Sequence, residues 1–267
     1  MEKQFRVAIL YICTGKYVVF WEDFYKSIEK YFLKKSVIEY FVFTDAPKIF
    51  DEERNDRIHR IPQENLGWPG NTLFRFRMFN SIKEKLIVFD YVFFLNANMV
   101  CMKKITEEEF LPLAQELLMV QHPGLYKSPA RKFPYERRKE SLACVSKKQG
   151  RDYVYGAING GKTEAFLKMA GRLEKNIEED YEKGIIAKWH DESHLNCYIW
   201  KNNNYRLLTP AYAYPEGWEL PFEEKIRVLD KSRKIELDSE KIKELEKRSI
   251  RKRLKRQILR KRYRNEK

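Results

Sequence analysis

Short apolar runs alternate with longer amphipathic segments along the first part of the chain. Residues 5–13 and 38–43 are rich in strand-forming residues, and between them residues 17–33 carry aromatic side chains at helical spacing. A third apolar run at 91–95 follows a glycine-containing loop and a helical pattern over 72–83. Strands that alternate with helices predict an α/β fold with a largely parallel sheet.

The second half of the chain continues this alternation. Residues 117–122 and 153–159 are further strand candidates, and 163–183 form a long helical pattern that Gly184 ends. A second helix is indicated over 189–200, whereas 208–221, with three prolines, is typical of a loop. Ligands of such sheets bind beyond the carboxyl ends of the strands, so the residues after Ile12, Phe43 and Leu95 are the first candidates for a site.

Charge divides the chain into two parts. The 267 residues carry a net charge of +14, of which residues 241–267, with 14 basic and 3 acidic residues, contribute +11. The chain as a whole is 43% hydrophobic, enough to form a large core. We therefore expect one globular domain over 1–240 and a basic amphipathic tail over 241–267. The apolar tail residues recur at roughly helical spacing: Leu245, Ile250, Leu254, Ile258 and Leu259.

The tail allows two interpretations with equal weight, a solvated helical extension and a peripheral anchor on an anionic membrane surface. Nucleic-acid binding is disfavoured, because Tyr263 is the tail's single aromatic residue. The sequence has no run of 18 apolar residues and no signal-peptide pattern, so we expect a cytoplasmic protein, at most peripheral to the inner face of the membrane. The four widely spaced cysteines predict buried thiols without disulfides.

Two polar clusters are candidates for chemistry, and neither belongs to a nucleotide-binding phosphate loop, whose glycine motifs are absent from the sequence. In the first, His190 and His194 stand four residues apart, as in zinc metalloproteases, but the glutamate that must follow the first histidine is replaced by Asp191. Chemistry by Asp191 or Glu192 is favoured over a zinc site or a structural histidine pair. In the second, Asn96-Ala97-Asn98 follows an apolar strand, and neutral amides are poor ligands for Mg²⁺ or Mn²⁺.

Several motifs together resemble glycosyltransferase family 6, the retaining α-1,3-galactosyl and N-acetylgalactosaminyl transferases that include the histo-blood-group A and B enzymes. The similarity spans about residues 5–235 and rests on the segments YFVFTD (40–45), DYV (90–92), HPGLY (122–126), YERR (135–138), GG (160–161) and WHDESHLN (189–196). The resemblance implies a GT-A fold, a single Rossmann-like domain with a central mixed sheet, followed here by the basic helical tail. It is strongest to the bacterial branch, in which Asn-Ala-Asn replaces Asp-x-Asp.

The family's roles then imply the following site. Glu192 would be the nucleophile, or the carboxylate that stabilises an oxocarbenium ion, and would also face the acceptor. Asp191 would bind hydroxyls of the donor sugar, while His122 and Trp189 would orient the acceptor galactose. The remaining donor-binding candidates are Ile12, Cys13, Thr14, Tyr17, Arg75, Asn96, Asn98, Gly156, Ala157, Lys231, Arg233 and Lys234.

The implied reaction is the transfer of GalNAc from UDP-GalNAc to a terminal β-galactose, 2-fucosylated as in the H antigen. The small residues Gly156 and Ala157 favour GalNAc over galactose, and Pro134 departs from the family at an acceptor contact. No divalent metal is expected, because the basic residues at 231–234 would neutralise the departing UDP. The alternatives are a UDP-galactose-dependent α-1,3-galactosyltransferase, an inactive carbohydrate-binding protein and, last, a zinc hydrolase.

Overall fold

The computed structural model describes residues 4–147, 149–233 and 235. The chain divides into a compact unit that ends at Leu229 and a second unit that begins at Asp230. In the described part of the second unit, Lys231–Arg233 form a short 3-10 helix, η5. The predicted tail at 241–267, and with it the proposed boundary at residue 240, lies outside the described residues.

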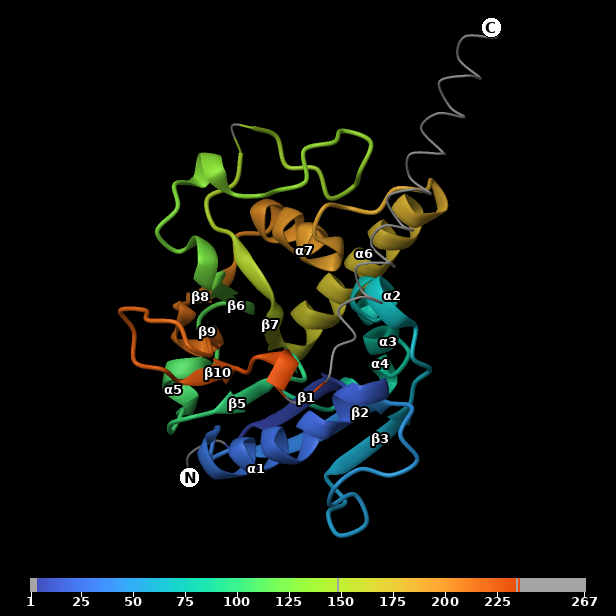
Figure 1. Ribbon diagram of the computed structural model, residues 1–267, viewed down its shortest axis with the longest axis vertical. Coiled ribbons are helices and arrows are strands. Elements are labelled where there is room, and N and C mark those ends of the chain that lie inside the picture. Colours follow the sequence, from blue (N-terminus) through green and yellow to red (C-terminus); the bar gives the residue numbers. More distant parts are fainter. Residues whose placement is uncertain (1–3, 148, 234, 236–267) are drawn as a thin grey trace, which may run out of the picture. The chain divides into compact units, whose positions relative to one another are not determined.

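A seven-stranded mixed sheet forms the centre of the first unit (Figure 1). Its strand order is β3-β2-β1-β4-β7-β6-β8. β7 is antiparallel to both of its neighbours, β4 and β6, and the other pairs are parallel. The strands are β1 (Arg6–Ile12), β2 (Val37–Thr44), β3 (Ile58–Pro62), β4 (Tyr91–Leu95), β6 (Leu117–Gln121), β7 (Val154–Lys162) and β8 (Tyr205–Leu208).

Helices lie along both faces of this sheet. The α-helices are α1 (Trp21–Tyr31), α2 (Gly67–Leu73), α3 (Arg75–Asn80), α4 (Lys83–Leu86), α5 (Glu107–Phe110), α6 (Thr163–Glu182) and α7 (His190–Lys201). Short 3-10 helices are η1 (Gly15–Phe20), η2 (Pro123–Leu125), η3 (Ala130–Lys132) and η4 (Pro210–Ala213). A second, three-stranded sheet has the order β5-β10-β9 and consists of β5 (Met99–Cys101), β10 (Ile226–Val228) and β9 (Tyr214–Pro215).

Alternation along β1 shows how the two faces are filled. Val7, Ile9 and Tyr11 pack with the buried aromatic residues of α1, whereas Ala8 and Leu10 pack with α3, α6 and α7. Successive side chains of a strand point to opposite faces, so an apolar run without polar interruptions is buried on both. The apolar strands predicted from the sequence thus became the centre of a three-layer α/β arrangement.

The structure confirms the predicted α/β class and the mixed sheet, and it corrects several elements. The helix expected over 72–83 is broken at Phe74 into α2 and α3, with α4 following. The 208–221 loop contains η4 and the short strand β9. β7 extends through Gly160 and Gly161, where a Cβ would lie within 2.4 Å of atoms of β4 or of the residue before β6. This glycine pair therefore serves close strand packing.

Two further expectations concern the whole described chain. All four cysteines are free thiols. Cys13, Cys101 and Cys197 are buried as predicted, whereas Cys144 is half-buried, so the prediction is wrong for this residue. Within the described residues, none of the helices combines the length and the apolar character that crossing a membrane requires.

Candidate active site

The start of α7 carries the two acidic residues of the site. Trp189 directly precedes the helix, His190 begins it with a φ of 51°, and Asp191 and Glu192 follow in the first turn. The Trp189 amide donates a 2.9 Å hydrogen bond to Ser193 Oγ. The amino end of a helix carries partial positive charge, so this position favours carboxylates.

Glu192 is fixed against β7 through the backbone of Gly156. The Gly156 amide donates a 2.8 Å hydrogen bond to Glu192 Oε2. A Cβ on Gly156 would lie 3.2 Å from the Glu192 Cβ and 3.3 Å from Oε2, so glycine permits this close approach. One turn later, Asn196 accepts a hydrogen bond from the Val154 amide at 2.8 Å and donates one to the Val154 carbonyl at 3.0 Å. These contacts lock α7 to β7 where the carboxylate lies.

An irregularity in β7 makes the Gly156 backbone available to side chains. The pairing of β6 with β7 shifts register between Met119 and Gln121. Such a bulge leaves backbone groups of one strand outside the ladder. The amide of Gly156 is used by Glu192, and its carbonyl accepts a 2.8 Å hydrogen bond from Arg75 Nη1.

Arg75 joins the second carboxylate to the same strand. Its Nε lies 3.0 Å from Asp191 Oδ2, and both side chains are buried. The Nε–H, however, donates to the Thr72 carbonyl at 3.2 Å, and Asp191 Oδ2 has no hydrogen bond among the described residues. The guanidinium also lies over the Phe94 ring, 4.6 Å from its centroid. A buried carboxylate oxygen that is charge-compensated but lacks a donor is suited to accept a hydrogen bond from a ligand hydroxyl.

Burial changes the acidity of both carboxyl groups. It raises the pKa of Asp191 to about 6, against the lowering effect of Arg75. Burial also raises the pKa of Glu192 to about 7, and the negative charge of Asp191 adds to this, while the Gly156 amide and Arg75 oppose it. Perturbed carboxyl groups that adjoin each other are typical of catalytic sites.

His122 lies at the end of β6 and is held as a neutral hydrogen-bond donor. Burial lowers the pKa of its ring to about 4. Nδ1 accepts a 3.1 Å hydrogen bond from the Gly124 amide, so in the neutral ring Nε2 carries the proton. The ring packs edge-on against Tyr153 and Tyr155, with centroids 5.9 and 4.9 Å away. The structure thus presents an N–H donor of the kind that binds a sugar oxygen.

Tyr153 and Tyr155 connect His122 to Glu192. Both hydroxyls have a raised pKa, chiefly through burial and next through the Glu192 charge. The Tyr153 hydroxyl is buried and lies near Glu192, but it does not reach hydrogen-bonding geometry with any described residue. Sequence reasoning missed both tyrosines, although their period-two spacing beside Gly156 was a usable signal.

Four of the donor-binding candidates lie at or just after the carboxyl end of β1, as the strand pattern predicted: Ile12, Cys13, Thr14 and Tyr17. The Cys13 amide donates to the Phe43 carbonyl at 2.9 Å, and Thr44 Oγ1 donates to the Cys13 carbonyl at 2.8 Å. Cys13 and Thr14 are buried, whereas Ile12 and Tyr17 are half-buried. Burial raises the pKa of the Cys13 thiol to about 12, so this side chain is an uncharged core group.

The Asn-Ala-Asn turn after β4 is internally hydrogen-bonded. Asn96 Nδ2 donates to Asn98 Oδ1 at 3.0 Å, and Asn98 Nδ2 donates to the Leu229 carbonyl at 2.6 Å. The Asn96 amide donates to the Ala157 carbonyl at 2.8 Å, which places the turn beside the Gly156-Ala157 segment. Asn98 is buried and its contacts serve the structure of the turn, whereas Asn96 is partly exposed.

The remaining candidates are Trp189, Ala157 and the basic residues at 231–234. Trp189 is 48% exposed, and Ala157 is buried. Lys231 and Arg233 belong to η5 in the second unit, and Lys234 lies outside the described residues. Their roles stay predictions.

The two histidines of the zinc hypothesis do not converge. The His190 ring contacts Trp68, with centroids 5.2 Å apart, whereas the buried His194 has Nε2 3.6 Å from Asp180 Oδ2. Among the described residues there is no group of three or more His, Cys, Asp or Glu side chains able to hold a metal ion.

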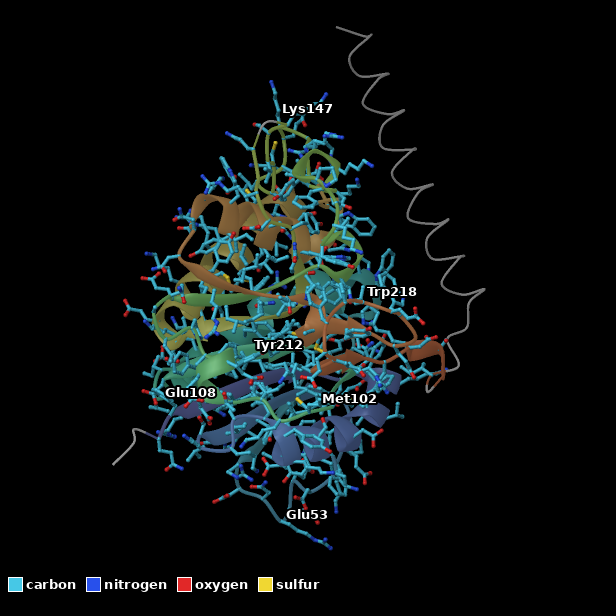
Figure 2. The ribbon with its side chains drawn as sticks, turned by 90° about the vertical axis from the view of Figure 1, so that its left-hand side faces the viewer. Glu53, Met102, Glu108, Lys147, Tyr212 and Trp218 are labelled. Atoms are coloured by element: carbon cyan, nitrogen blue, oxygen red, sulfur yellow. The ribbon has the colours of Figure 1, made fainter. Side chains whose placement is uncertain are left out.

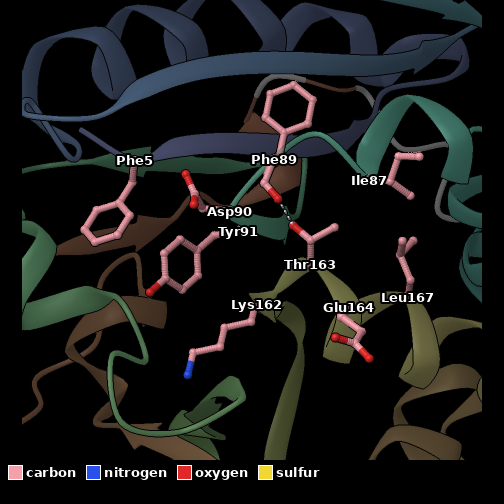
Figure 3. A pocket seen from close by; sticks show the side chains of 9 residues that line it. All are labelled: Phe5, Ile87, Phe89, Asp90, Tyr91, Lys162, Thr163, Glu164 and Leu167. Carbon is pink, nitrogen blue, oxygen red and sulfur yellow. Dashed lines mark hydrogen bonds between the residues drawn. The ribbon is translucent and has the colours of Figure 1, made fainter. Parts of the chain in front are cut away.

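A cavity of about 510 Å³ opens at the opposite ends of the strands from the carboxylates (Figure 3). It lies beside Tyr91, the first residue of β4, beside Asp90, which precedes it, and beside Lys162 at the end of the antiparallel β7. Thr163 Oγ1 in its wall donates to the Phe89 carbonyl at 2.7 Å. Since these are the amino ends of the parallel strands, the cavity is separate from the carboxylate site.

Three similar curated proteins are all sugar transferases. The O-antigen biosynthesis glycosyltransferase WbnI of Escherichia coli is 36% identical over 85% of this chain and 95% of its own length. A globoside alpha-1,3-N-acetylgalactosaminyltransferase 1 of Gallus gallus is 29% identical, and a histo-blood group ABO system transferase 2 of Rattus norvegicus 28%, over 81% and 82% of this chain. The chain spans 64% and 68% of the length of these two animal relatives.

With these similarities, the mixed α/β sheet and the paired carboxylates at its edge define a glycosyltransferase of the GT-A type. A sequence model of glycosyltransferase family 6 matches residues 1–239. The chain belongs to glycosyltransferase family 6.

Proposed function

We propose that the protein transfers GalNAc from UDP-GalNAc to the 3-hydroxyl of a terminal β-galactose, 2-fucosylated as in the H antigen, with retention of the α configuration. The observation that carries this proposal is the buried Glu192 carboxylate, held by the Gly156 amide next to Asp191 and Arg75. In the transfer, the acceptor oxygen forms a bond to the anomeric carbon, UDP leaves with the electrons of the broken C–O bond, and the proton of the acceptor hydroxyl passes to a phosphate oxygen of the departing UDP. Glu192 stabilises the positive charge on the sugar, covalently or by its own charge.

The other groups have separate tasks in this proposal. Asp191 accepts a hydrogen bond from a donor-sugar hydroxyl through Oδ2, which is buried and has no hydrogen-bond donor among the described residues. His122 donates through Nε2 to the acceptor galactose, and Trp189 packs against the apolar face of that sugar. The acetamido preference is supported by the small Ala157 and by the globoside relatives, whose name states an N-acetylgalactosaminyltransferase. The small size of Gly156 also serves its contact with Glu192.

The decisive experiment offers UDP-GalNAc and UDP-galactose with 2-fucosyllactose and with lactose, and measures product and released UDP. We expect GalNAc transfer to 2-fucosyllactose to be fastest. Faster transfer from UDP-galactose would reassign the donor, and saccharide binding without transfer from either donor would support the inactive binding protein instead.

We propose that this transfer needs no divalent metal. The Asn96–Asn98 hydrogen bond satisfies the turn internally, whereas two aspartates there would repel each other unless a cation lay between them. The charge of the departing UDP is neutralised in this proposal by Lys231, Arg233 and Lys234. Activity should survive excess EDTA, and loss of activity that Mn²⁺ restores would reject the proposal.

We also propose that the basic tail holds the protein at an anionic membrane surface. This rests on the sequence alone, namely the charge of +11 over 241–267 and its spaced apolar residues. Flotation with phosphatidylglycerol-containing vesicles should carry the full chain, and a chain ending at residue 240 should stay behind. Equal flotation of the two would rule out the anchor.

A further inference from the structure

Trp218 is a half-exposed tryptophan with no part in the site described above. It is 51% exposed at the surface of the first unit (Figure 2), in contrast to the core residue Trp21, which is 1% exposed. An indole that keeps half its area in water contributes little to the core, and large exposed aromatic surfaces mark binding sites.

The loop that carries Trp218 is held in one conformation. It leaves β9 through Gly217, whose φ is 77°, and the Trp218 amide donates to the Pro215 carbonyl at 3.2 Å. The Leu220 amide donates to the Tyr214 hydroxyl at 2.7 Å. The indole is therefore positioned in advance, which lowers the entropic cost of binding a ligand.

The loop places Trp218 beside His122. A Cβ on Gly124 would lie 3.4 Å from the His122 Cε1 and 3.8 Å from the Trp218 Cη2, so the imidazole and the indole flank the same glycine. A second contact joins the two segments, because the rings of Tyr126 and Phe222 pack edge-on with centroids 5.3 Å apart. Gly124 therefore leaves room for about one methyl group between the Nδ1–Cε1 edge of the imidazole and the indole.

We propose that Trp218 and the gap at Gly124 form a second saccharide-binding surface, which takes the sugar unit joined to the terminal galactose of the acceptor. The C–H face of a pyranose packs on the indole while its hydroxyls stay in water, a combination suited to a half-exposed tryptophan. This inference rests on the proposed function, because it assumes that His122 holds the terminal galactose.

The test compares methyl β-galactoside with lactose as acceptors for Trp218→Ala. We expect KM for lactose to rise about tenfold, as loss of a tryptophan anchor worth a little over 1 kcal/mol requires, with kcat unchanged. KM for methyl β-galactoside should change less than twofold, and Trp218→Phe should restore most of the lactose affinity. Tyr181→Ala, on an aromatic residue that is also 51% exposed, is the matched control and should change neither.

A second variant and a binding measurement keep the two proposals distinguishable. Gly124→Leu fills the gap and should raise the Kd for lactose as Trp218→Ala does, while the affinity for UDP, measured by calorimetry, stays that of the wild type. If the wild type binds lactose through Trp218 but transfers no sugar to lactose or to 2-fucosyllactose from either donor, the proposed function fails and the second surface stands. If Trp218→Ala weakens both acceptors equally, or neither, the second surface is overturned.

Discussion

The Gly156 amide donates its hydrogen to Glu192 Oε2 at 2.8 Å, and the missing side chain of this glycine is what lets the carboxylate come so close. The contact joins a bulged strand to the first turn of a helix that lies 36 residues later in the chain. Its consequence is a carboxylate that is both buried and fixed in direction.

Gly156→Ala should therefore reduce catalysis more than stability. The new Cβ, 3.2–3.3 Å from Glu192 atoms, forces the carboxylate to move by a few tenths of an ångström. Misplacement of a catalytic group on this scale is expected to lower kcat by about 10- to 100-fold. Gly171→Ala, on α6 where a Cβ meets no atom within 4 Å, is the matched control. Unchanged kcat for Gly156→Ala, measured with saturating donor, contradicts the role given to this contact.

Loss of Arg75 should destabilise the fold through Asp191. Arg75→Met leaves a buried carboxylate without its cation, which is expected to cost about 3–5 kcal/mol of unfolding free energy. Arg75→Met combined with Asp191→Asn should recover much of that loss, because the uncompensated charge is removed. Urea unfolding of the two single variants and the double variant measures the coupling; additive effects would show that the pair is not energetically linked. Transfer should stay low in all three.

The pH dependence of transfer should follow Glu192. In the proposed mechanism Glu192 must be ionised to stabilise the anomeric cation. Its pKa is raised to about 7, so kcat should fall by about tenfold per unit below pH 7 and level off above it. A plateau that extends down to pH 5, measured at saturating donor and acceptor, would contradict this assignment.

The same pKa has a consequence for stability. Because the folded pKa of Glu192 lies above its usual value of 4.5, the folded state holds its proton more tightly than the unfolded chain. Ionisation therefore costs the fold nothing below pH 4.5, progressively more up to pH 7, and at most roughly 3 kcal/mol above it. Glu192→Gln should accordingly raise Tm at pH 8 and leave it unchanged at pH 4, where both chains carry a neutral group. A lower Tm at pH 8 would indicate that the carboxylate is stabilising.

Substitution of His122 should weaken acceptor binding and leave the reaction of the donor with water unchanged. His122→Ala removes the Nε2–H donor, so KM for lactose should rise by about fivefold, in line with a lost hydrogen bond of roughly 1 kcal/mol. Slow hydrolysis of the UDP-sugar, which needs no acceptor, should persist at the wild-type rate. Parallel loss of hydrolysis would place His122 in the donor site instead.

Several elements could not be predicted for identifiable reasons. β3 is a five-residue strand at the edge of the sheet with alternating partly exposed residues and a terminal proline, and β8 is a four-residue strand, so neither stands out as an apolar run. β7 continues through two glycines, which have low strand propensity and are used because neighbouring backbone lies too close for a side chain. The break at Phe74 lies within a continuous helical pattern.

The sequence by itself determined the α/β class, the apolar central strands, the end of the strands at which the candidate site residues lie and the acidic pair at 191–192, because these follow from periodicity and from local motifs. Only the tertiary structure decided that Arg75 compensates Asp191, that Gly156 holds Glu192, that Tyr153 and Tyr155 connect them to His122, and that Trp218 lies next to that histidine. Each of these contacts joins segments that are distant in the chain. Their geometry depends on the bulge in β7, on the close contact of Glu192 with Gly156 and on the path of the loop that carries Trp218. Residue types and their spacing along the chain do not determine these features.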